Sequence, residues 1–161
     1  MSFNIQSIIM RKYLFLLLAL VVVSRAGFAQ GQIEQHRQFT GAKAGKSSYK
    51  AIYQLDTNVP GRINKAIRNI NNLLNDPRLK GKIEVELVAF SKGTDAYLKN
   101  SGFEKAFREL AEKGVIIAQC ENTMRERKLS KDQLYDFVAY VPSGNGELVI
   151  RGSDGWVIVK P

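Results

Sequence analysis

The sequence predicts an α/β protein with three layers, in which a mostly parallel sheet of about five strands lies between helices. Two observations lead to this prediction. Short apolar or alternating segments recur between residues 49 and 159, and stretches with helical spacing of apolar residues separate them, as in parallel sheets. In addition, residues 115–119 are apolar almost throughout, which is typical of a central strand covered on both faces.

The strands are predicted from apolar runs and period-two alternation, bounded by turn residues. They are residues 49–55, 83–90, 115–119, 137–141 and 156–159. The helices are predicted from the periodicity of their apolar residues and from residues that favour helix ends. They are residues 60–75, 94–100, 103–111, 120–128 and 147–151. Pro60 suits a first helical turn, and Gly114 suits the position after a last one.

The amino-terminal region has the features of an export signal. Two basic residues precede an unbroken apolar run over residues 14–23, and small residues follow at Gly27 and Ala29. We therefore predict a signal peptide over residues 1–29 and an exported protein, which is periplasmic if the source is a Gram-negative bacterium. The run is too short to span a bilayer, so no membrane attachment is expected after cleavage.

The rest of the chain divides into a polar linker, residues 30–48, and one α/β domain, residues 49–161. Either Met1 or Met10 suits the start of translation. Loss of the signal peptide removes three basic residues and lowers the formal net charge from +9 to +6. This charge is dispersed, which favours solvated helix faces over nucleic-acid binding. The one histidine, His36, has no neighbouring ligands, so we expect no metal site and no cofactor.

The single cysteine, Cys120, is the candidate catalytic residue. It follows the predicted strand 115–119 and begins a predicted helix, where the helix start favours the thiolate. An exported protein with one cysteine cannot form a disulfide within the chain. Free cysteines are also among the most buried residues, so a small core residue is the alternative interpretation of Cys120.

Polar residues follow several predicted strands at their carboxyl ends. In parallel α/β sheets these ends share one rim, where ligands bind. Such residues also cap helices and form turns, so each has a purely structural alternative. The candidate ligand-binding residues are Asp56, Asn58, Asn122, Thr123, Ser143 and Gly144.

Several segments resemble the DsrE/DsrF-like family of small α/β proteins. Cys120 is followed by Arg127 seven residues later, then by Leu129 and a short helix. Residues 56–66 and 142–156 resemble the exported branch of the family, so that the resemblance covers about residues 49–161.

The resemblance implies a five-stranded sheet between helix layers and assembly as a trimer or hexamer. The best understood members carry sulfur as a persulfide on a cysteine after a central strand, matched here by Cys120, and exchange it with donor or acceptor proteins. Two features depart from these members. Lys128 follows Arg127 where sulfur carriers often have glycine, and this chain carries an export signal whereas the known relays are cytoplasmic.

Three hypotheses stay open. In the first, Cys120 carries sulfur or undergoes reversible oxidation. In the second, the protein is a small-ligand-binding module without catalysis. In the third, it is an oligomeric structural module with Cys120 in its core, and apolar side chains such as Phe137, Tyr140 and Trp156 beside the last strands are buried on self-association. The sequence does not decide whether the protein is an enzyme; the accessibility and pKa of the Cys120 thiol would discriminate most directly.

Overall fold

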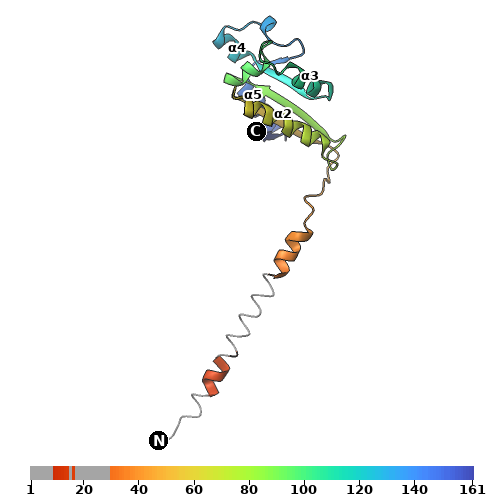
Figure 1. The fold of residues 1–161 in the computed structure, drawn as a ribbon, viewed down its shortest axis with the longest axis vertical. Coiled ribbons are helices and arrows are strands. Elements are labelled where there is room, and N and C mark those ends of the chain that lie inside the picture. Colours follow the sequence, from red (N-terminus) through yellow and green to blue (C-terminus); the bar gives the residue numbers. More distant parts are fainter. Residues whose placement is uncertain (1–8, 15, 17–29) are drawn as a thin grey trace. The chain divides into compact units, whose positions relative to one another are not determined.

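The computed structural model describes residues 9–14, 16 and 30–161 of the chain (Figure 1). The chain divides into two units, Met1–Lys43 and Ala44–Pro161. In the first unit, residues 30–38 form a helix within the stretch predicted as a linker. The predicted signal peptide lies mostly outside the described residues and stays a prediction. In the described part of the chain, none of the helices has the length and apolar character needed to cross a membrane.

The second unit contains a five-stranded sheet in the order β4-β3-β2-β1-β5, and every pair of neighbouring strands is parallel. The strands are β1 (Tyr49–Leu55), β2 (Ile83–Ala89), β3 (Ile116–Cys120), β4 (Ala139–Val141) and β5 (Val157–Val159). The helices are α2 (Pro60–Asn75), α3 (Glu104–Glu112), α4 (Glu121–Arg127) and α5 (Gly144–Ser153), with two 3₁₀ turns, η1 (Ser91–Tyr97) and η2 (Lys131–Gln133). The predicted α/β fold class is confirmed.

The two faces of the sheet are covered by different helices. Helices α2 and α3 bury residues such as Ile63 and Phe107 against one face, in the larger apolar cluster. Helix α5 covers the other face, where Leu148 and Trp156 join the inward residues of the central strands in a smaller cluster. Alternate residues of each strand therefore enter different clusters, as the pleat of a strand requires.

A buried acid stands on the face that α5 covers. Glu86, in the centre of β2, is 0% exposed, and its Oε2 lies 2.8 Å from Nη2 of Arg151 on α5. Arg151 also pairs with Glu147 at 2.8 Å and stacks over the ring of Trp156. Burial raises the pKa of Glu86, and the charge of Arg151 acts in the opposite direction. Arg151 thus offsets the cost of placing a carboxylate beneath the helix.

Some predicted boundaries and one surface were wrong. Strand β4 begins at Ala139 and not at residue 137, and α5 begins at Gly144, three residues before the prediction. The early start of α5 has a physical cause, because the Ser143 hydroxyl accepts a hydrogen bond from the Gly146 N–H at 3.2 Å and caps the helix. Trp156, expected to offer apolar surface, is buried in the smaller cluster. The large apolar side chains exposed on α5 and β5 are instead Val149, Ile150, Val157 and Ile158.

Candidate functional site

Cys120 is the last residue of β3 and the N-cap of α4. Its Sγ accepts a hydrogen bond from the backbone N–H of Thr123 at 3.4 Å. The side chain is only 4% exposed, although it lies at the carboxyl rim of the sheet, where the sequence predicts it. The structure thus places the thiol where α4 begins and covers it almost completely.

Hydrogen-bond donors from two helix starts converge on this sulfur. Burial acts to raise the pKa of Cys120, but hydrogen bonds from the N–H and hydroxyl of Thr123, and from the N–H groups of Gly144 and Asn122, act to lower it. The donors outweigh burial, and the pKa of Cys120 lies below that of an ordinary thiol. Because Gly144 is the first residue of α5, the site joins segments that lie far apart in the sequence.

Apolar residues and a glycine lie near Cys120 in the sheet and at the start of α5. Cys120 pairs with Val141 of β4, and the preceding residue, Gln119, pairs with Ala89, which Phe90 follows in the sequence. Phe90 and Val141 both pack against the smaller apolar cluster. Gly144 is buried against Phe90, and a Cβ at Gly144 would lie 2.7 Å from Cδ1 of that ring. Only glycine therefore allows this backbone to lie against the Phe90 ring.

A chain of polar contacts extends from the thiol to the start of α2. The Thr123 hydroxyl accepts a hydrogen bond from the Ser91 N–H at 3.0 Å, and Arg127 donates to the Ser91 carbonyl at 3.1 Å. Arg127 also forms an ion pair with Asp95, which accepts a hydrogen bond from Asn58 at 2.9 Å. Ser91 has a φ of 51°, a left-handed conformation that is costly for a non-glycine residue. These contacts hold η1 against α4.

Asp56 belongs to a different part of the rim. It accepts hydrogen bonds from Gln54 at 3.2 Å and from Lys160 at 2.9 Å, and the Lys160 hydrogen bond is the main cause of its lowered pKa. Asp56 and Lys160 line a cavity of about 340 Å³ beside the start of α2. The residues that line this cavity include neither Cys120 nor Thr123, whose N–H donates to its sulfur.

Of the predicted site residues, Thr123 donates a hydrogen bond to the Cys120 sulfur, and the N–H groups of Asn122 and Gly144 act to lower the pKa of this thiol. Asn58 reaches it only through the polar chain described above, and Ser143 caps α5. The structure holds no ligand, so the binding role of all of them stays a prediction.

Phe90 and Asp95 were not among the predicted site residues. The position of Phe90 at the end of a predicted strand could have placed it on the rim, because it directly follows β2, the neighbour of the strand that ends at Cys120. Nothing in the local sequence marks Asp95, because its partners Asn58 and Arg127 are 37 and 32 residues away.

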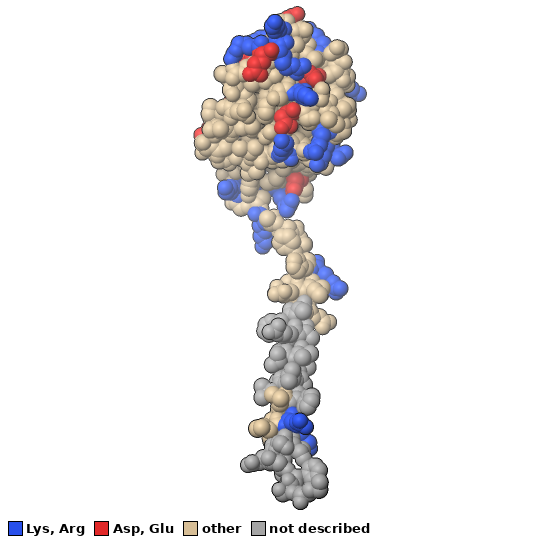
Figure 2. All heavy atoms as spheres, turned by 90° about the vertical axis from the view of Figure 1, so that its left-hand side faces the viewer, with Lys and Arg blue, Asp and Glu red and all other residues tan. Residues whose placement is uncertain are grey.

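The site has no features of a metal centre or of a strongly charged groove. Within residues 9–14, 16 and 30–161, no group of three His, Cys, Asp or Glu side chains is arranged to hold a metal ion. On the face of the domain in Figure 2, Lys and Arg are spread among Asp and Glu and among uncharged residues. The site is a nearly buried thiol with a lowered pKa, which accepts a hydrogen bond from the Thr123 N–H at the start of α4.

The fold and this site define a small parallel α/β protein with a thiol at the carboxyl rim of its sheet. The model of the DsrE/DsrF-like family matches residues 50–161. The chain therefore belongs to the DsrE/DsrF-like family.

Among solved structures, the chain is similar to MTH1491, a protein of unknown function from Methanobacterium thermoautotrophicum. The two share 30% sequence identity with a TM-score of 0.67, and the match covers 71% of this chain and 100% of that one. Among functionally curated proteins, none matched the chain significantly.

Proposed function

We propose that Cys120 accepts a sulfane sulfur atom as a persulfide and passes it to an acceptor. The observation that carries this proposal is the Thr123 N–H, which donates to Sγ at 3.4 Å, together with a pKa of the thiol that lies below its ordinary value. The thiolate is the nucleophilic form of cysteine, and a lowered pKa favours it. Membership of the DsrE/DsrF-like family supports a role in sulfur relay in general terms.

The proposed step is a transfer of one sulfur atom between thiols. The Cys120 thiolate attacks the terminal sulfur of a donor persulfide, R–S–SH, and a new S–S bond forms while the donor S–S bond breaks. The electron pair of the broken bond leaves with the donor sulfur as R–S⁻, and the proton stays on the transferred sulfur. The products are Cys120–S–SH and a donor thiolate, so no further oxidant or reductant is needed.

The proposal includes the setting expected from the sequence: an exported protein that self-associates as a trimer or hexamer and exchanges sulfur with a partner protein. Large apolar side chains are exposed on both α5 and β5, which pack against each other, and apolar surface that gathers on neighbouring elements is commonly buried between subunits; this supports self-association. Sedimentation of the purified protein at micromolar concentration tests this, and a monomer would contradict it.

The low exposure of Cys120, 4%, favours a second candidate function. In this alternative the thiol is a core residue, and the protein is a structural or small-ligand-binding module without thiol chemistry. The two functions differ in whether Sγ is reached in the folded protein.

The test is incubation of the protein with a small persulfide donor, followed by mass spectrometry of the intact chain. We expect a mass gain of one sulfur atom that a reductant removes, and none in Cys120→Ser. The variant Thr123→Val keeps the thiol and the shape of its neighbour but removes the Thr123 hydroxyl, so it is expected to load sulfur more slowly. A wild-type protein that gains no sulfur while folded, but gains it once unfolded in urea, would favour the second candidate.

A further inference from the structure

We propose that a cavity of about 470 Å³ beside the edge strand β5 binds a small, uncharged and mainly apolar molecule that carries a hydrogen-bond acceptor such as a ketone. A cavity of this size is typical of small-molecule sites. Its lining residues include neither Cys120 nor any of the other residues predicted for the carboxyl rim. The inference therefore goes beyond the proposed function and does not depend on it.

The walls of this β5 cavity come from one face of the sheet. Ala51 pairs with Val157, and Tyr53 pairs with Val159, so these alternate residues of β1 and β5 lie on the same side. Ala51 and Tyr53 belong to the larger apolar cluster on that side, whereas Val157 is 63% exposed and leaves the cavity open at the edge. The other apolar and aromatic lining residues are Tyr49, Leu73, Leu79 and Ile83.

Tyr53 brings a hydroxyl without a protein partner into this apolar lining. The residue lines the cavity and is only 5% exposed, yet within the described part of the chain no group forms a hydrogen bond with its hydroxyl. The hydroxyl oxygen is not among the completely enclosed polar atoms, which belong to Glu86 and Gln119, so a small molecule can reach it. Buried tyrosine hydroxyls usually have a partner, and a ligand in the cavity would supply the missing one.

Two other buried tyrosines on the same face show the usual arrangement. The Tyr97 hydroxyl donates to the Leu87 carbonyl at 3.0 Å, and the Tyr135 hydroxyl shares a hydrogen bond with Ser101. Neither Tyr97 nor Tyr135 lines the β5 cavity. The unpaired hydroxyl therefore coincides with the cavity.

The surroundings of Tyr53 define the kind of group that the ligand presents. Burial raises the pKa of Tyr53, so its hydroxyl stays protonated near neutral pH and can donate a hydrogen bond. The ligand accordingly carries an acceptor, such as a carbonyl oxygen, on an otherwise apolar body.

The charges around the cavity favour an uncharged ligand. Lys46 and Asp154 have opposite signs and are both exposed, so they offer no buried partner to an ion. Lys50 also lines the cavity, but its ammonium group pairs with Glu84 at 3.9 Å and lies over the ring of Trp156, which belongs to the cluster on the other face. A charged molecule would lose hydration among the apolar walls without compensation.

The test uses prodan, an uncharged naphthalene with one ketone, and the full-length folded protein. Prodan fluoresces more strongly in apolar surroundings and at longer wavelength when its ketone accepts a hydrogen bond. We expect saturable binding that is absent when the protein is unfolded in urea. Hexyl methyl ketone should displace prodan, whereas octanoate, which has the same number of carbons and a negative charge, should not do so at equal concentration.

Tyr53→Phe removes only the hydroxyl and should weaken prodan binding by about two- to tenfold, the range expected for one hydrogen bond. The bound prodan should then emit at shorter wavelength. Because the Tyr53 hydroxyl has no protein partner, this variant should keep wild-type stability. The matched control is Tyr135→Phe, which should lose stability with its Ser101 hydrogen bond but bind prodan as the wild type does.

Two neighbouring residues of β5 test the location. Val157→Asp places a carboxylate on the wall of the cavity and should weaken binding by about tenfold or more. Ile158→Asp changes an exposed residue that pairs with Ile52, in the cluster on the other face, and should leave binding unchanged.

The proposal is overturned if the folded protein shows no saturable binding, or if both β5 variants lose binding equally, because prodan then adheres to exposed apolar surface. Undiminished binding by Tyr53→Phe, or displacement by octanoate as effective as that by the ketone, would also overturn it. Cys120→Ser should bind prodan like the wild type, so the result for this cavity is independent of the result for sulfur loading.

Discussion

Replacement of Arg151 by methionine tests whether the buried acid beneath α5 depends on its partner. Arg151 contacts Glu86 and Glu147, and its guanidinium lies 4.3 Å from the centre of the Trp156 ring. Methionine keeps most of the apolar contact with the ring but removes the charge. Neither carboxylate oxygen of Glu86 has a hydrogen-bond partner in the described structure, so loss of the Arg151 ion pair leaves a fully buried carboxylate without compensation.

The cost is limited by protonation of Glu86, because a buried carboxyl becomes neutral when its charge is unsupported. Keeping a carboxyl of ordinary pKa 4.5 protonated at pH 7 costs about 3 kcal/mol, at about 1.4 kcal/mol for each pH unit. This agrees with the loss of about 3–5 kcal/mol expected when one partner of a buried ion pair is removed. At about pH 5 the same cost falls below about 1 kcal/mol.

The sign of the pH dependence follows from the direction of the pKa change. The pKa of Glu86 is raised in the folded protein, so the folded state binds more protons than the unfolded state above the ordinary pKa of the group. The contribution of Glu86 to stability is therefore most favourable below its ordinary pKa, and it is lost as the pH rises through the raised pKa of the folded protein. In Arg151→Met we expect the free energy of unfolding, measured with urea, to be about 2–3 kcal/mol higher at about pH 5 than at pH 7.

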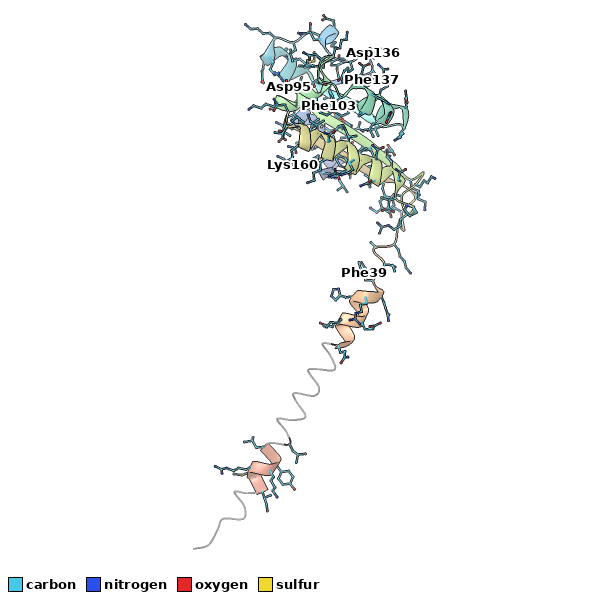
Figure 3. All side chains as sticks on the ribbon, viewed as in Figure 1. Phe39, Asp95, Phe103, Asp136, Phe137 and Lys160 are labelled. Atoms are coloured by element: carbon cyan, nitrogen blue, oxygen red, sulfur yellow. The ribbon has the colours of Figure 1, made fainter. Side chains whose placement is uncertain are left out.

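Arg108 provides a matched control for this experiment. It also bridges two carboxylates, Glu104 at 2.8 Å and Asp136 at 2.9 Å, and lies 4.5 Å from the centre of the Phe137 ring, but its carboxylate partners are exposed. Figure 3 labels Asp136 and Phe137, which lie close together in the view. Arg108→Met should lose little stability, and the loss should not change between the two pH values, because exposed ion pairs are screened by solvent. Equal losses at pH 5 and pH 7 in Arg151→Met would show that packing on Trp156, and not the charge of Glu86, accounts for the effect.

Three further results are expected. Lys128 ends α4 in the left-handed region, with a φ of 55°. Lys128→Gly should therefore raise the free energy of unfolding in urea by about 0.5–1 kcal/mol, and a decrease would contradict this. A Cβ at Gly93 would lie 2.0 Å from the Leu55 carbonyl oxygen, so Gly93→Ala should lose at least about 2 kcal/mol in the same assay, and wild-type stability would refute the clash. Mass spectrometry of protein from the native host should show a mature terminus just after Ala29, and an uncleaved chain would disprove the export signal.

The fold was predictable because strand and helix periods are local properties of the chain. The run before Cys120 placed the thiol at the rim, and the same rule placed Gly144 there. The burial of Glu86 was not predictable, because alternation with Val85 and Leu87 separates the two faces of β2 but does not say that a helix covers the second face. The pairing of Cys120 with Val141 likewise depends on strand register, which the sequence does not specify.

The geometry of η1 is the other part that sequence alone did not give. Ser91 adopts a positive φ, which glycine or asparagine usually marks, and here serine occupies that position because contacts with Thr123 and Arg127 hold it. Both contacts join residues more than 30 positions apart. Local propensity therefore predicts a loop after β2 but not the way in which that loop is fastened to α4.

The order of the strands has a consequence for how the sheet ends. The two shortest strands, β4 and β5 with three residues each, are the two edges, and the two seven-residue strands lie inside. An edge strand has unpaired N–H and C=O groups with which a strand of another molecule can pair, and a short edge strand has few of them. The domain thus keeps its long, strongly pairing strands inside the sheet, and its short edges offer few backbone groups on which another chain could extend the sheet.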